Sequence, residues 1–297
     1  MHSTVKEHYD ELMETGVTKI EGGFPDGMVQ QVLEGLHKFI DKNDHLFGKH
    51  RDELGHYPRV VNLHLAFKPM LKLFTENPTS LAVQDAFFGK PTSIYTSLYF
   101  EKGTGQPIHR DTPVFSTKPE YQYLGVWVAL EEANEMNGRL MVIRGGHKVA
   151  ELDREALALQ KYANLESIQK TDNELWILYQ DTVHKECLER GLKVEEISAN
   201  PGDVIIWHPQ LPHGGSQIKD TKLSRESVVM HTTPVGVPVY HQDVFFNPKK
   251  LVPEKAPWIY IDHGDRKYAS HEYVDFVFMH AGKRHTDPHR PNEFITA

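Results

Sequence analysis

The chain has 297 residues, of which 39% are apolar and 25% charged, an ordinary composition for a globular protein with one large domain or two small ones. Its net charge of −8 argues against a nucleic-acid-binding surface, and no apolar run approaches the roughly 20 residues that cross a bilayer. The single cysteine, Cys187, cannot form an internal disulfide and the N-terminus has no signal-peptide core, so we expect a reducing, cytoplasmic location.

The first part of the chain favours helices. Residues 27–43 carry apolar side chains at helical spacing, which predicts an amphipathic helix. Two shorter helices are expected at residues 69–76 and 78–88, divided at Pro78. Because no internal repeat or low-complexity linker interrupts the sequence, we predict a single domain over residues 1–297.

A predicted strand at residues 93–100 is followed by a short sequence with two metal-binding residue types. If residues 106–111 are extended, His109 and Asp111 point to one side while Arg110 points to the other, because alternate side chains of a strand share a face. An imidazole and a carboxylate placed in this way can bind one metal ion.

The middle of the chain returns to regular elements. Residues 122–130 read as a strand, and residues 151–190 are charged and helix-rich, with a break at residues 171–173. Further strands are predicted at residues 193–198, 203–207 and 227–233.

A second histidine follows one of these strands. Residues 200–203 form a tight turn before an apolar run, so that His213 lies just beyond a buried strand. Two histidines and one carboxylate, here His109, Asp111 and His213, form the facial triad of non-haem Fe(II) oxygenases, which leaves three metal positions open. Arg225, 12 residues further, could hold the far carboxylate of a keto acid through a forked pair of hydrogen bonds.

The C-terminal residues 236–297 are rich in histidine and aromatic side chains. Their histidines include His241, His263, His271, His280, His285 and His289. Their spacing lacks a compact ligand pair such as HxH, so a packed lid or a dimer contact is favoured over a second metal site. The sequence does not decide between lid and dimer contact.

A series of short stretches in the central part of the chain has a recognisable order. The stretches are Gln106 to Asp111, Gly125 to Ala133, Asn137 to Leu140, Gly145 to Lys148, Pro201 to Val204, His208 to Ser216, and Arg225. Together they resemble the phytanoyl-CoA dioxygenase-like family of Fe(II)/2-oxoglutarate oxygenases. The resemblance covers roughly residues 90–235, and residues 1–80 and 236–297 show no such match.

The resemblance implies a mainly β fold with peripheral helices, the double-stranded β-helix or jelly roll of cupin-like proteins. It implies that His109, Asp111 and His213 bind Fe(II), with 2-oxoglutarate as co-substrate and O2 as oxidant. The implied reaction oxidises a C–H bond of the substrate and releases succinate and CO2. Related halogenases have a small residue in place of the carboxylate, so Asp111 favours hydroxylation or another oxidation. In the family, residues 151–190 are an insertion that covers the active-site mouth.

The resemblance also indicates residues around the co-substrate. Arg225 is expected to anchor 2-oxoglutarate, although a surface salt bridge is the alternative. Ser216 resembles the family serine that contacts the same carboxylate, and Trp127 the tryptophan beside it, or else an ordinary core aromatic. Gln106 is expected to face substrate or co-substrate. Ser216 and Arg225 lie one residue further along than the family pattern, because the two glycines after His213 supply an extra residue.

The favoured function is oxidation of a small metabolite, without nucleic-acid or membrane partners and with a homodimer left open. The alternative within enzymes is an acyl-CoA hydroxylase, for which Arg139, Arg144 and Lys148 are neighbouring basic residues. A zinc hydrolase would leave Arg225 unexplained. A non-catalytic binding protein on the same fold would tolerate loss of the triad or of Arg225, yet all four residues are present. The sequence does not identify the substrate.

Overall fold

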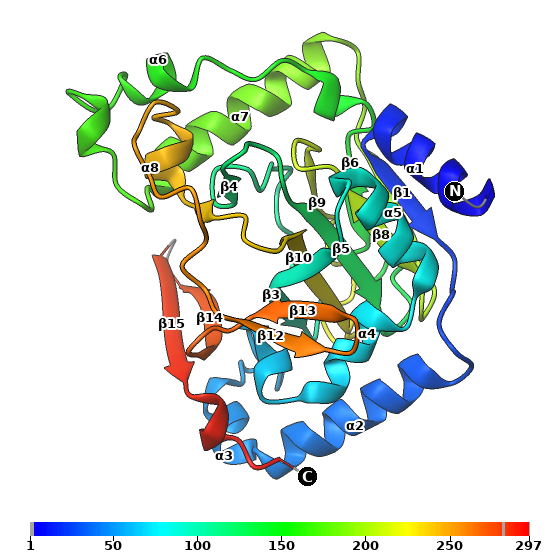
Figure 1. Cartoon of the computed structure of the whole chain (residues 1–297). Helices are drawn as coiled ribbons and strands as arrows, with labels where there is room; N and C mark the ends of the chain where they lie inside the picture. Colours follow the sequence, from blue (N-terminus) through cyan, green and yellow to red (C-terminus); the bar gives the residue numbers. More distant parts are fainter. Residues whose placement is uncertain (1–2, 281–282, 297) are drawn as a thin grey trace.

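The chain folds into many β-strands with helices around them, and the computed structural model describes residues 3–280 and 283–296 (Figure 1). The α-helices are α1 (Ser3–Thr15), α2 (Met28–Lys42), α3 (Asp44–Phe47), α4 (Lys72–Thr75), α5 (Pro78–Phe88), α6 (Arg154–Ala158), α7 (Asn173–Glu189) and α8 (Gln242–Phe245). The strands are β1 (Val17–Ile20), β2 (Arg59–Val61), β3 (Thr92–Phe100), β4 (Ser116–Thr117), β5 (Leu124–Ala129), β6 (Leu140–Val142), β7 (Glu195–Ile197), β8 (Val204–Trp207), β9 (His213–Gly215), β10 (Ser227–Pro234), β11 (Val239–Tyr240), β12 (Tyr260–His263), β13 (Arg266–Ala269), β14 (Val274–His280) and β15 (Lys283–His289). Short 3-10 helices are η1 (Gly48–His50), η2 (Leu63–Leu65), η3 (Lys68–Leu71), η4 (Gly146–Lys148), η5 (Leu165–Ser167) and η6 (Pro291–Glu293).

A large sheet runs through the middle of the molecule (Figure 1). Its strands follow the order β1-β8-β5-β10-β3-β2-β14-β15, and β13 of the β12–β13 hairpin pairs in parallel with β3. A smaller sheet has the order β7-β6-β9. Side chains of both sheets share one apolar cluster, which includes Trp127 of β5, Leu140 of β6 and Ile205 of β8. Two sheets packed around a common core form a jelly roll, as predicted.

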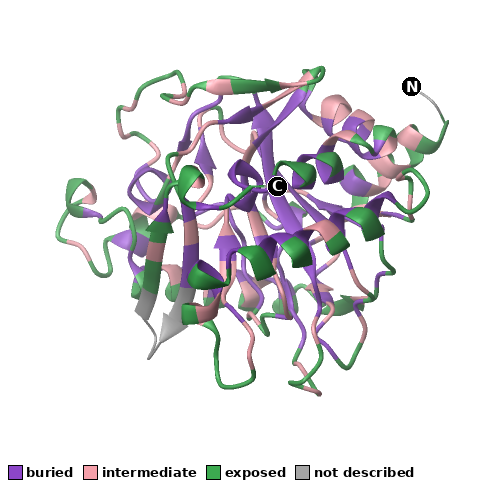
Figure 2. Ribbon diagram, turned by 90° about the horizontal axis from the view of Figure 1, so that it is seen from below, coloured by how far each residue is buried: buried purple, intermediate pink, exposed green. Residues whose placement is uncertain are grey.

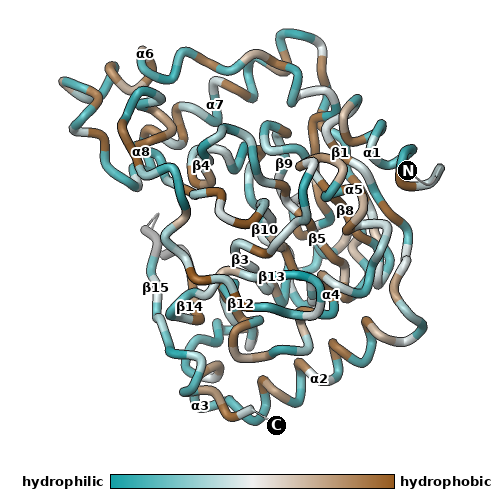
Figure 3. Tube along the Cα trace, in the orientation of Figure 1, coloured by the Kyte–Doolittle hydropathy of each residue, from teal (hydrophilic) through white to brown (hydrophobic). Residues whose placement is uncertain are grey.

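Helices cover the other face of the large sheet. Helix α2 turns Val32, Leu36 and Phe39 toward it, and these side chains share a core cluster with Val60 of β2 and Tyr99 of β3. Figure 2 shows a buried sheet behind helices with exposed outer sides, and Figure 3 shows hydrophobic and hydrophilic residues alternating along α2. Burying one such side chain typically stabilises a fold by about 1.5–3 kcal/mol. Within the described residues, no helix has both the length and the apolar character needed to cross a membrane.

Most predicted elements lie within a few residues of their expected positions. The helix predicted at residues 27–43 is α2, and the helix predicted at residues 78–88 is α5. Helix α5 begins at Pro78, and the side chain of the preceding Asn77 caps it by accepting a hydrogen bond from the Ser80 amide. The predicted strands 93–100, 122–130, 193–198, 203–207 and 227–233 are β3, β5, β7, β8 and β10.

Two sequence predictions need correction. The helix expected at residues 69–76 is divided into η3 and α4, where a 3-10 turn that begins at Lys68 leads into the α-helix. The spacing of His109 and Asp111 fits a strand, but within residues 106–111 His109 alone joins a β-pair, an isolated bridge with His213. Neither difference moves the residues predicted to bind metal away from one another.

The close approach of two strands gives a stability prediction. A Cβ on Gly125 of β5 would lie 2.0–2.4 Å from three atoms of the Trp207 ring on β8. Gly125→Ala is therefore expected to destabilise the fold by about 1–3 kcal/mol, because the overpacked core must shift. Urea denaturation measures this effect. Gly35→Ala in α2 is the control, since its Cβ would meet its nearest atom at 3.4 Å and alanine favours helix. Equal loss of stability in both variants would contradict the argument.

Candidate active site

His109 and His213 face each other across a short β-bridge. The His109 amide donates to the His213 carbonyl at 2.8 Å, and the His213 amide donates to the His109 carbonyl at 2.9 Å. Their ring centroids lie 4.6 Å apart, and both residues are buried. Reciprocal backbone bonds thus bring together two imidazoles that are far apart in the sequence.

Backbone carbonyls orient both rings. Nδ1 of His109 lies 2.8 Å from the Pro107 carbonyl oxygen, and Nδ1 of His213 lies 3.0 Å from that of Leu211. Because a carbonyl oxygen only accepts, each Nδ1 carries the ring proton, and in the neutral ring Nε2 keeps its lone pair. Both Nε2 atoms face Asp111. This orientation is the one in which metal-binding histidines are held in proteins.

The Asp111 carboxylate completes the cluster. Its Oδ1 lies 3.4 Å from Nε2 of His109, and its Oδ2 lies 3.4 Å from Nε2 of His213. In the metal-free protein, burial raises the pKa of this carboxyl, but the charge of a protonated His213 and hydrogen bonds donated by His109, His213 and His231 outweigh it and hold the pKa well below its ordinary value. A bound metal would replace the protons on Nε2 of His109 and His213 and leave both rings neutral. One ligand atom from each of the three residues lies within 4.8 Å of the others. The structure therefore brings the predicted ligands together, with the carboxylate ionised.

A third histidine, His231 of β10, forms a hydrogen bond with the Asp111 carboxylate. Its Nε2 lies 3.0 Å from Oδ2 of Asp111, and its ring stacks on Phe115 with centroids 3.9 Å apart. The carboxylate accepts, so Nε2 of His231 donates and fixes the orientation of Asp111. The sequence alone did not indicate this residue. A histidine in an otherwise apolar and β-branched strand was the only local signal.

Helix α7 holds the backbone between the two ligands His109 and Asp111. The side chain of Gln180 accepts from the Arg110 amide at 2.7 Å and donates to the Arg110 carbonyl at 2.9 Å. The Arg110 guanidinium points away from the cluster, as predicted, and donates to the carbonyl of Gly146 at 2.9 Å. Helix α7 thus positions the segment that carries His109 and Asp111 directly, a role of Gln180 that the sequence did not indicate.

Arg225 and Ser216 lie beside the turn at Gly138. Arg225 is buried, and its Nη1 donates to the Gly138 carbonyl at 3.1 Å, while its Cζ lies 5.5 Å from the centre of the Trp127 ring. Burial lowers the pKa of Arg225 to about 10. Among the described residues, no carboxylate pairs with Arg225, and the buried hydroxyl of Ser216 has no hydrogen-bond partner. The alternative of a surface salt bridge for Arg225 is therefore wrong.

Gln106 lies beside the cluster, next to His109. Its Nε2 is 3.1 Å from Nε2 of His109. The ring of Trp176, from α7, lies 5.8 Å from that of His109. Both side chains are half-buried: Gln106 comes from the chain just before His109, and Trp176 comes from helix α7.

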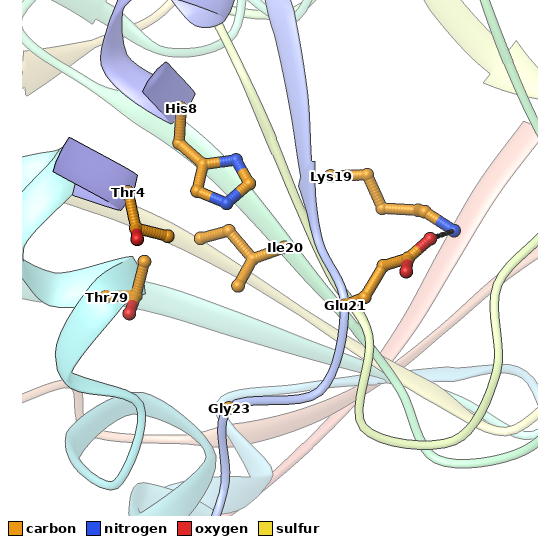
Figure 4. A pocket seen from close by; sticks show the side chains of 7 residues that line it. All are labelled: Thr4, His8, Lys19, Ile20, Glu21, Gly23 and Thr79. Atoms are coloured by element: carbon orange, nitrogen blue, oxygen red, sulfur yellow. Dashed lines mark ion pairs between the residues drawn. The ribbon is translucent and has the colours of Figure 1, made fainter. Parts of the chain in front are cut away.

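A surface hollow near the N-terminus lies on other elements. Figure 4 shows the side chains that line it, from α1, β1 and α5. Lys19 pairs there with Glu21 at 2.9 Å and with Asp203 at 3.5 Å, and His8 bonds Thr18 at 2.9 Å. These groups satisfy one another, and we assign the hollow no role.

Relatives of the chain are found by sequence and by structure. The family model described as phytanoyl-CoA dioxygenase (PhyH) matches residues 12–227. Phytanoyl-CoA dioxygenase domain-containing protein 1 of Danio rerio is 32% identical over 115 residues, which cover 37% of this chain and 38% of that protein. The match thus spans well under half the length of this relative.

Solved structures share the fold. The epimerase SnoN, in complex with Fe3+, alpha ketoglutarate and nogalamycin RO, has a TM-score of 0.61 at 17% identity, over 90% of this chain and 98% of SnoN. EctD from S. alaskensis, with 2-oxoglutarate and 5-hydroxyectoine, has a TM-score of 0.58 at 17% identity, over 79% of this chain and 78% of EctD. These likenesses confirm the predicted fold class. Because the family model matches well over half of this chain, the chain belongs to the phytanoyl-CoA dioxygenase (PhyH) family.

Proposed function

We propose that the protein is an Fe(II)/2-oxoglutarate-dependent dioxygenase that hydroxylates or otherwise oxidises a C–H bond of a small metabolite. The observation that carries the proposal is the combination of three buried ligands, His109, Asp111 and His213, with the buried Arg225. Family membership supports the same reaction class. The proposed unit is a single domain over residues 1–297.

The cluster suits Fe(II) by the chemistry of its donors. Two neutral imidazole nitrogens and one ionised carboxylate are the donor set of non-haem iron oxygenases. The iron, together with 2-oxoglutarate and O2, supplies the oxidising power for C–H cleavage, and succinate and CO2 leave. His109, Asp111 and His213 would bind the iron, and His231 would keep the Asp111 carboxylate in its orientation. Zinc accepts the same donors, but a zinc hydrolase has no use for Arg225.

Arg225 is the residue that we propose for the far carboxylate of 2-oxoglutarate. Even with a pKa of about 10, its guanidinium is charged at pH 7, and a buried charge is stable only with a partner. The two oxygens of a carboxylate fit the guanidinium fork. The Ser216 hydroxyl is proposed to donate to the same group, and the Trp127 ring to form one wall beside it.

Gln106 is proposed to face substrate or co-substrate. Its amide now donates toward Nε2 of His109, the nitrogen that would bind the metal. One lone pair cannot serve both partners, so the amide must turn when metal binds. The Gln106 amide is then free to form a hydrogen bond with substrate or co-substrate.

The acyl-CoA alternative receives less support. A CoA phosphate needs free basic side chains, whereas the basic residues considered for this role are ion-paired. The pairs are Arg139–Glu196 at 2.6 Å, Arg144–Glu195 at 3.1 Å and Lys148–Glu14 at 2.8 Å. A smaller substrate therefore fits the observations better.

A metabolite library tests the function. Purified protein with Fe(II) and 2-oxoglutarate is expected to form succinate in proportion to one class of metabolite, with acyl-CoA esters included as competitors. Succinate formation stimulated by acyl-CoA alone would favour the alternative. A protein that binds metal and metabolite but forms no succinate would be a binding protein on this fold.

His231→Ala should weaken Fe(II) binding and activity by about 10- to 100-fold, because partners of metal ligands typically contribute that much. Anaerobic Fe(II) titration measures the change. Asn247→Ala, which removes another buried polar side chain away from the cluster, serves as control. Unchanged affinity in His231→Ala would mean that Asp111 keeps its orientation without this hydrogen bond.

The insertion at residues 151–190 is proposed to act as a lid. Lids are long excursions from a rigid scaffold and have low local stability. We expect residues 151–190 and part of residues 236–297 to exchange amide hydrogens more slowly once Fe(II), 2-oxoglutarate and substrate are bound under anaerobic conditions. Strand β10 in the core serves as the internal reference. Equal exchange in both states would mean that these segments serve packing or association instead.

A further inference from the structure

A second group of two histidines and one aspartate lies on other elements. His50 of η1 contacts Asp287 of β15 through Nε2, at 2.9 Å from Oδ2. His289, two residues further along β15, places its own Nε2 at 3.1 Å from the same oxygen. The three ligand atoms all lie within 4.8 Å of one another. Residues from opposite ends of the chain thus present two imidazole nitrogens to one carboxylate oxygen.

The aromatic surroundings fix both rings. His50 stacks on Phe276 of β14 with centroids 4.5 Å apart and planes 22° apart, and His289 meets the edge of the same ring. The side chains of His50 and His289 are 10% and 9% exposed, whereas that of Asp287 is 38% exposed. The nitrogens are therefore held in place on a side that solvent can reach through Asp287.

His289 lies between two carboxylates, one at each ring nitrogen, so this position favours a positive charge, either a second ring proton or a bound cation. Its Nδ1 lies 3.1 Å from Glu293 Oε2, and its Nε2 lies 3.1 Å from Asp287 Oδ2. The neutral ring has one proton and can donate to one of these carboxylates only. Glu293 is itself held by the Arg290 amide at 2.8 Å. With the proton on Nδ1 and donated to Glu293, the Nε2 lone pair points toward Asp287, which is the carboxylate–histidine arrangement of metal sites.

We propose that His50, Asp287 and His289 bind one Zn(II) ion that ties the C-terminal hairpin to the N-terminal part of the chain. Imidazole nitrogen and carboxylate oxygen are zinc ligands, whereas calcium and magnesium prefer oxygen alone. Around a tetrahedral zinc with bonds of about 2.1 Å, ligand atoms lie roughly 3.4 Å apart. The present separations of 2.9 and 3.1 Å need to open by only a few tenths of an ångström. The proposal is independent of the function proposed for the other cluster.

Lys49 competes with the metal. Its Nζ lies 3.0 Å from Oδ2 of Asp287, but the side chain is 46% exposed and can leave. The Lys49→Met variant should therefore bind zinc more tightly than the parent. A cluster held together only by ion pairs would bind no zinc in this variant, and the loss of the Lys49 contact would lower the midpoint of thermal unfolding equally with and without zinc.

The test uses Co(II) as a visible probe, then Zn(II), in the Asp111→Ala/His213→Ala background, where the first cluster is disabled. One equivalent is expected to bind, with Co(II) bands displaced by Zn(II) and a raised midpoint of thermal unfolding. His289→Ala should abolish binding, and the milder Glu293→Gln should weaken it by about tenfold. Circular dichroism of each metal-free variant checks folding.

Two outcomes would overturn the proposal. One is the absence of a bound equivalent in a background protein that is folded. The other is binding that neither His289→Ala nor Glu293→Gln alters. Either result leaves the iron-dependent activity of the wild type untouched, so the two proposals fail separately.

Discussion

Asp111→Ala is expected to abolish substrate oxidation and to weaken Fe(II) binding sharply. The variant loses a ligand oxygen and also the negative charge between His109 and His213, which lies 3.4 Å from each Nε2. The remaining neutral imidazoles would face a divalent cation in a buried site without a compensating charge, which is unfavourable. Both metal affinity and turnover should therefore fall together.

Succinate formation and anaerobic Fe(II) titration measure the two losses. Chelator should silence the wild type in the same assay, and added Fe(II) should restore it. Asp243→Ala is the matched control, because Asp243 is also a buried aspartate but pairs with Lys250 at 2.9 Å. Substantial oxidation by Asp111→Ala, without added carboxylate, would remove Asp111 from the site.

Among the candidate metal ligands, His109 and Asp111 could be predicted from their local spacing, whereas the distant His213 could be predicted only from the sequence that surrounds it. The segment that carries His109 and Asp111 is nevertheless not a regular strand. Pro107 has no amide hydrogen, and both backbone groups of Arg110 bond the side chain of Gln180, so the segment cannot join a regular sheet. His109 and Asp111 still face the same side, since alternation survives in an irregular extended chain.

The glycine that follows the distal histidine has a structural reason. A Cβ on Gly214 would lie 2.6 Å from the Gln106 carbonyl oxygen, so the backbone of β9 passes too close to the first ligand segment for a side chain. Arg225 and Ser216 come to lie beside the same turn at Gly138 despite the shift. The sequence showed the two glycines but not the close backbone approach at Gly214.

Contacts made by tertiary packing could not be predicted. His231 reaches Asp111 from a different strand, and the spacing between them has no local meaning. The same holds for His50, which meets Asp287 and His289 only because η1 packs against the C-terminal hairpin. A search for compact histidine pairs within residues 236–297 overlooks a site whose second imidazole comes from the other end of the chain.

Arg225→Gln is expected to raise the 2-oxoglutarate concentration required for activity by roughly 25-fold or more. Loss of one partner of a buried, charge-assisted pair costs about 2–5 kcal/mol, and 1.4 kcal/mol corresponds to a factor of ten. Arg225 has no competing acid partner among the described residues, so its charge is available to the co-substrate. The maximal rate at saturating 2-oxoglutarate should change less than this requirement.

Thermal unfolding gives a second, activity-free measurement of the same variant. Burial lowers the pKa of Arg225 to about 10, which means that its charged form is less stable in the folded protein than in the unfolded chain. Without 2-oxoglutarate, Arg225→Gln should therefore be at least as stable as the wild type at pH 7.

With metal and 2-oxoglutarate under anaerobic conditions, the wild type should gain stability and the variant much less. Arg139→Gln, at an ion-paired and more exposed arginine, is the control and should keep the full gain. An equal gain in Arg225→Gln would assign the co-substrate carboxylate to another basic residue.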